Sequence, residues 1–184
     1  MFFCKRLFLL LGAMMVPTQG SAIAQTEDAA TLNPIVKMSD KVVSGCGIEI
    51  LALKGAQQFS VSIVIERTSQ GRATRLKAIA TSSGSAENLA AIKEAFIETS
   101  GLSSREFFLP RRENPAGPFE VNAFDTRAPV GFLLQQILMG GATVGITQSG
   151  EKLIWKVSGP APESVQSAYL TCAGDLYRAA SASN

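Results

Sequence analysis

The stretch FSVSIVIE (residues 59–66) decides how this chain is expected to fold, because apolar and polar side chains alternate along it. One face carries only large apolar residues, namely Phe59, Val61, Ile63 and Ile65. The opposite face includes Ser60, Ser62 and Glu66. This period of two predicts a half-buried β-strand.

Segments on both sides of this stretch extend the strand pattern. Arg67–Gly71 supplies turn residues, and Arg72–Thr81 then alternates again, with Leu76, Ala78 and Ala80 on one side and Arg75 and Lys77 on the other. Upstream, Gly45–Leu53 has apolar residues on both faces, which is typical of a central or largely covered strand. Three consecutive strands predict an antiparallel meander.

The rest of the chain mixes helices with further strands. A helix is expected from Ser85, a suitable N-cap, to Gly101, a suitable residue after a helix end, and an aperiodic loop then covers Leu102–Pro118. The expected downstream elements are a strand at Phe119–Phe124, a helix at Val130–Met139, a hairpin of Ala142–Gln148 and Glu151–Ser158, and a helix at Glu163–Ala180. Strands and helices do not alternate one to one. We therefore expect an α+β fold, an antiparallel or mixed sheet of about six strands with about three helices packed on it.

The N-terminus has the three parts of a secretory signal peptide, expected to cover residues 1–24. Lys5 and Arg6 are followed by the apolar run LFLLLGAMMV (residues 7–16) and by the small-x-small sequence Ala22-Ile23-Ala24. Residues 25–41 are polar and are expected to be a flexible lead-in, and residues 42–184 a single globular domain. The periplasm is the expected location, with secretion to the medium as the alternative.

Charge and composition exclude several classes of function. Removing Lys5 and Arg6 from the 17 basic residues leaves 15, equal to the 15 acidic residues, so no nucleic-acid partner is expected. The chain has no histidine, the commonest general base near neutral pH and a common metal ligand, and neither a metal nor a cofactor is expected. No apolar stretch after the signal peptide is long enough to cross a membrane.

Cleavage of the signal peptide also removes Cys4 and leaves Cys46 and Cys172. In an oxidising compartment, two remaining cysteines indicate one disulfide that joins the two ends of the domain. A redox-active pair and two buried free thiols are the alternatives. The lack of a closely spaced CxxC disfavours the redox pair.

The loop at residues 103–118 (SSREFFLPRRENPAGP) is the first candidate for a binding surface. It places arginines beside phenylalanines, both common anchors at interfaces, and the candidate residues are Arg105, Phe107, Phe108, Arg111 and Arg112. Arg111 and Arg112 could hold a carboxylate or phosphate. In the alternative interpretation, the phenylalanines fix the loop to the core, and the arginines are solvated or pair with Glu106 and Glu113.

A serine–lysine pair is the weaker, catalytic candidate. Ser149 and Lys152 match the S-x-x-K pattern of serine–lysine acyl enzymes, which place the serine at a helix start so that the lysine follows one turn later. Here the pattern falls on an expected hairpin turn, where an ordinary Ser-Gly turn is the simpler explanation.

The C-terminal sequence GFLLQQILMGGATVGITQSGEKLIWKVSGPAPESVQSAYLTCAGDL (residues 131–176) orders helix, glycine, two strands, glycine and a helix with Tyr169 and Cys172. This order resembles the end of invasion-associated locus B-like proteins, small exported proteins of alphaproteobacteria. The resemblance implies a role in host-cell entry or in the envelope. That family usually has more cysteines and an early tryptophan, whereas the only tryptophan here is Trp155, so no functional residue is transferred.

Three functions remain open from the sequence. The first is a non-catalytic accessory protein that binds a protein partner in the envelope or the host. The second is a binder of a small anion or other small ligand. The third is a histidine-free hydrolase that uses Ser149 and Lys152. The sequence does not decide the oligomeric state.

Overall fold

The computed structural model describes residues 30–69, 71–82, 91–108, 119–123 and 127–181. Its first sheet has the strand order β1-β2-β3-β4-β6, formed by β1 (Ala30–Ser39), β2 (Val42–Lys54), β3 (Gln57–Thr68), β4 (Gly71–Ser82) and β6 (Phe119–Ala123). Its second sheet has the order β5-β7-β8, formed by β5 (Ile92–Glu98), β7 (Gly141–Gln148) and β8 (Glu151–Ser158). The helices are α1 (Arg127–Gly140) and α2 (Glu163–Ser181), with a 3₁₀ turn, η1, at Ser104–Glu106. The expected signal peptide lies outside the described residues.

The antiparallel meander expected from residues 45–81 is confirmed. β2, β3 and β4 pair in order, with Phe59 opposite Ala52 on one side and Ala80 on the other. The alternating face of β3 is the centre of the core, since Phe59 and Ile63 are fully buried and Val61 is 1% exposed. The expected α+β class follows, although the strands form two antiparallel sheets, and the described residues hold two α-helices and one 3₁₀ turn.

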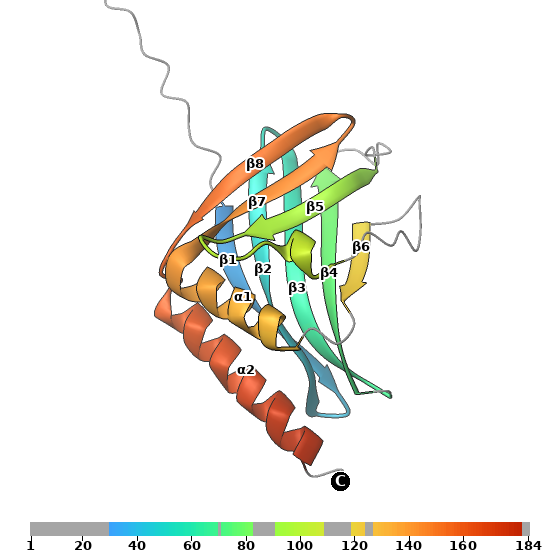
Figure 1. Cartoon of the computed structure of the whole chain (residues 1–184), viewed down its shortest axis with the longest axis vertical. Helices are drawn as coiled ribbons and strands as arrows, with labels where there is room; N and C mark the ends of the chain where they lie inside the picture. The colour runs from blue at the N-terminus through green and yellow to red at the C-terminus, as the bar shows by residue number, and fades with distance from the viewer. Residues whose placement is uncertain (1–29, 70, 83–90, 109–118, 124–126, 182–184) are drawn as a thin grey trace, which may run out of the picture.

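Two different layers cover the inner face of the five-stranded sheet. The three-stranded sheet crosses one half of this face, and the two helices lie over the other half (Figure 1). At the sheet crossing, the rings of Phe59 on β3 and Trp155 on β8 are 5.1 Å apart. One continuous cluster of buried apolar side chains joins both sheets and both helices. The molecule therefore has a single hydrophobic core across its described part.

The expectation of a flexible lead-in over residues 25–41 is wrong for its second part. Residues 30–39 form β1, which pairs with β2 from Ala30 opposite Ala52 to Ser39 opposite Val42. Leu32 on this strand is 7% exposed and belongs to the core. The strand was hard to predict because its sequence, ATLNPIVKMS, contains Pro34 and leaves Val36 and Met38 exposed, features that an edge strand tolerates.

The expected helix over Ser85–Gly101 is contradicted by β5. Residues 92–98 pair with β7, with Phe96 opposite Gly145. Alanine, glutamate and lysine give this segment a helical propensity, but burial of Ala95 and Ile97 against the core favours the strand, and tertiary packing overrides propensity. The proposed N-cap, Ser85, lies outside the described residues.

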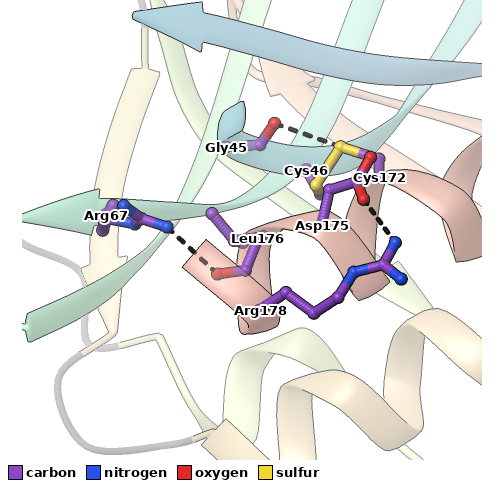
Figure 2. Close-up of a disulfide and its surroundings, with 7 residues drawn as sticks. All are labelled: Gly45, Cys46, Arg67, Cys172, Asp175, Leu176 and Arg178. Atoms are coloured by element: carbon purple, nitrogen blue, oxygen red, sulfur yellow. Dashed lines mark hydrogen bonds and ion pairs between the residues drawn. A yellow bond between two sulfur atoms is a disulfide. The ribbon is translucent and has the colours of Figure 1, made fainter. Parts of the chain in front are cut away.

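The disulfide expected between Cys46 and Cys172 is present (Figure 2). It joins the inner face of β2 to the buried side of α2, and both cysteines are at most 3% exposed. Arg67, near the end of β3, donates from its guanidinium to the Leu176 carbonyl on the same helix, 3.3 Å away.

No helix within the described ranges is long and apolar enough to cross a membrane.

Candidate functional site

The expected binding loop is fastened to β5 where the structure describes it. The buried Ser104 hydroxyl accepts a hydrogen bond from the Ile97 backbone N–H at 2.9 Å. Phe108 is 6% exposed and lies in the core, while Phe107 is half-buried against it. These two phenylalanines therefore fix the loop to the core. Arg111 and Arg112 lie outside the described residues.

Arg105 extends from this loop over the outward face of β5. Its Nε lies 2.9 Å from Glu94, its Nη1 lies 2.8 Å from Glu98, and its guanidinium carbon stands 3.6 Å above the centre of the Phe96 ring. Two carboxylates and an aromatic face thus hold the charge. All three partners belong to β5. The Arg105 guanidinium is therefore already paired with two carboxylates of the chain itself, where an anionic ligand would otherwise bind.

Strand register places nine outward-facing positions of the second sheet in three rows. The rows across β5, β7 and β8 are Glu94–Thr147–Lys152, Phe96–Gly145–Ile154 and Glu98–Thr143–Lys156. Each of the two outer rows has a glutamate on β5, a threonine on β7 and a lysine on β8, whereas the middle row has no charged residue. We call these nine residues the outer grid. Sequence reasoning missed it because its β5 column fell within the expected helix.

The centre of the outer grid is closed by Phe96. Although this side chain points outward, it is 1% exposed, since it lies across Gly145 beneath Arg105. A Cβ at Gly145 would come within 2.1 Å of the Phe96 ring, so glycine is required for this packing. The glutamates on the β5 side of the grid are thus paired within the chain.

The β8 column of the grid remains open. Ile154 is 51% exposed between the exposed Lys152 and Lys156. Within the described residues neither lysine forms an ion pair, and the Lys152 ammonium stands 5.3 Å from the Phe96 ring centre. An exposed apolar side chain between two lysines without described ion pairs is the part of the grid suited to contact an acidic molecule.

A pocket of about 460 Å³ opens at the end of the grid nearest α1. Gly141 and Val157 are among its lining residues, and the backbones of β7 and β8 are close there, since a Cβ at Gly141 would lie 2.2 Å from the Val157 carbonyl oxygen. The polar residues of its wall include Glu98, Ser100, Thr143, Lys156 and Ser158. Hydroxyls and one ammonium suit a small anion, whereas Glu98 is held by Arg105.

Ser149 and Lys152 lie in and after the tight turn between β7 and β8. Ser149 has a φ of 52°, and Lys152 stands on β8 opposite Thr147. This placement differs from the helix-start geometry that a serine–lysine mechanism needs.

Across the described ranges, no group of three or more histidine, cysteine or acidic residues is arranged to hold a metal ion.

Comparisons with known proteins return no match among family models, curated proteins or solved structures. The resemblance of residues 131–176 to invasion-associated locus B-like proteins therefore stays a prediction.

Proposed function

We propose that this protein is an exported, non-catalytic accessory protein of the cell envelope or of host contact. It binds a protein partner through the open β8 column of the outer grid. The observation that carries the proposal is Ile154, which is half exposed between two lysines without ion pairs in the described part of the chain. The disulfide supports export, since such bonds persist in oxidising compartments.

Site-specific crosslinking in the producing cells tests this contact. A photo-reactive amino acid at position 154 should give a discrete crosslinked species. The same group at position 170 on α2 is the matched control, because Leu170 is an exposed apolar residue at 65%. Equal crosslinking at both positions, or none at 154, would contradict the proposed surface.

Export is tested on the same cells. The mature protein should begin near Gln25 and should be released with the periplasmic fraction. A chain that retains Lys5 and Arg6 and stays in the cytoplasm would contradict the proposal.

The pocket beside Lys156 favours a second candidate, a binder of small anions. Titration with acetate and with inorganic phosphate should then shift the backbone amide resonances of Thr143 and Ser158, which line it. Replacing Lys156 with methionine should abolish the shifts, whereas the same change at Lys77, on the other sheet, should not. Shifts that survive the Lys156 change would contradict an anion site here.

A further inference from the structure

β8 is an edge strand with one hydrogen-bonding side uncovered by any other described strand. It pairs with β7 along its whole length, from Gln148 opposite Glu151 to Gly141 opposite Ser158, without a register shift. Antiparallel pairing uses only alternate backbone groups of an edge strand, so the remaining N–H and C=O groups face outward. β8 is therefore a regular template for one more strand.

Core packing holds this template in place. The inward side chains of β8 are buried, with Leu153 and Val157 at 7% exposure and Trp155 at 2%. The Trp155 indole N–H also donates to the Leu53 carbonyl oxygen on the first sheet, 3.3 Å away. A strand that is already ordered loses little conformational freedom when a partner adds to it.

The outward side chains of β8 define the chemistry of an added strand. In an antiparallel pair, side chains directly opposite one another are in contact, and opposite charges there stabilise the pair. Lys152 and Lys156 favour an acidic residue opposite each of them, and Ile154 between them favours an apolar one. The complementary segment reads acidic–x–apolar–x–acidic.

The same register disfavours a second copy of this chain as the occupant. If two β8 strands paired with Ile154 opposite Ile154, each Lys152 would stand opposite the other copy's Lys156. Like charges directly opposite destabilise a strand pair. The two lysines thus oppose self-pairing and favour an acidic partner.

We propose that β8 accepts an extended acidic segment of a protein partner as a fourth, antiparallel strand of the second sheet. The inference rests on the proposed function, because it specifies how the partner engages the β8 column. Backbone pairing supplies the binding mode, and the two lysines with Ile154 set the preference for the segment.

Synthetic peptides and the mature, disulfide-bonded chain provide the test. The probe contains two glutamates and a central valine, separated by single threonines, and its scrambled form is the control. Binding should slow hydrogen exchange at alternate backbone amides of β8. The double variant Lys152→Glu/Lys156→Glu should bind about ten-fold more weakly and should gain affinity for a peptide with lysines in place of the glutamates. Lys77→Glu, on the outer face of the first sheet, should change neither affinity.

Several results would overturn strand addition. These are equal binding of the scrambled probe, no binding of the probe, an unchanged affinity of the charge-reversed variant, or protection of amides in β1 or β6 in place of β8. Protection of β8 that rises with protein concentration without peptide would indicate self-pairing instead. If crosslinking at position 154 succeeds while the β8 amides stay unprotected, the proposed function stands and this binding mode fails. Strand addition without crosslinking in cells would instead argue against a cellular partner.

Discussion

Phe96 and Gly145 pack closely at the centre of the outer grid. The ring occupies the space that a side chain at position 145 would need, and it supports the Arg105 guanidinium. We expect Gly145→Val to lower the free energy of unfolding by about 2 kcal/mol, because the ring or the strand must move. Urea unfolding measures the effect.

Gly174 on α2 provides the matched control for that experiment. A Cβ there would meet no atom within 4 Å, and the residue lies within a helix. Gly174→Ala should therefore stabilise the protein by about 0.5–1 kcal/mol. A Gly145→Val protein as stable as the wild type would contradict the close packing of Phe96.

Tyr169 predicts a feature of alkaline titration. Burial, with a smaller contribution from Tyr177, raises the pKa of Tyr169 to about 12 from its ordinary 10. The folded state disfavours the tyrosinate form of Tyr169. The stability that the neutral Tyr169 side chain contributes is therefore complete below pH 10 and is lost as the pH rises towards 12. Tyrosinate absorbance should include a step near pH 12 that Tyr169→Phe removes and Tyr177→Phe retains. A single step near pH 10 would show that Tyr169 is solvated.

At the scale of elements, the disulfide is the covalent link between α2 and the first sheet. Cys46 and Cys172 are 126 residues apart in sequence, so the bond closes a long loop of the unfolded chain. The change Cys46→Ala/Cys172→Ala should cost about 4–5 kcal/mol of unfolding free energy on the loop-entropy account. Chemical denaturation with and without reductant measures it. Reductant should destabilise the wild type and leave the variant unaffected. Two alkylatable thiols in the native exported protein would contradict the bond.

Elements with strong local patterns were predictable from the sequence, and those without them were not. The alternation in β3 and β4 predicted these strands, and the β7–β8 hairpin and the helix α2 were also expected. β5 did not, because Ile92, Ala95 and Phe96 also fit helical spacing, and this segment became a strand through pairing with β7. That single misassignment hid the partners of Arg105. The candidate arginine was found, but its ion pairs were not.

At the scale of the whole molecule, the relative placement of the two sheets could not be read from the sequence. Periodicity predicts which face of a strand is buried, but it does not say what covers that face. Here the second sheet and the two helices share this role, and the contact between Phe59 and Trp155 joins strands far apart in the chain. The binding surface therefore depends on a layer that local patterns could not position.

A single core predicts that both layers unfold together. Trp155 is the only tryptophan, and it lies at the crossing of the two sheets against the fully buried Phe59. Its fluorescence reports on that crossing, whereas far-ultraviolet circular dichroism reports on all strands and helices. Because one apolar cluster joins both sheets and both helices, the two thermal transitions should coincide. A fluorescence transition that comes first would show that the second sheet separates from the first before the meander melts. The β8 edge would then be a locally unstable template, and an added partner strand would have to order it as well as pair with it.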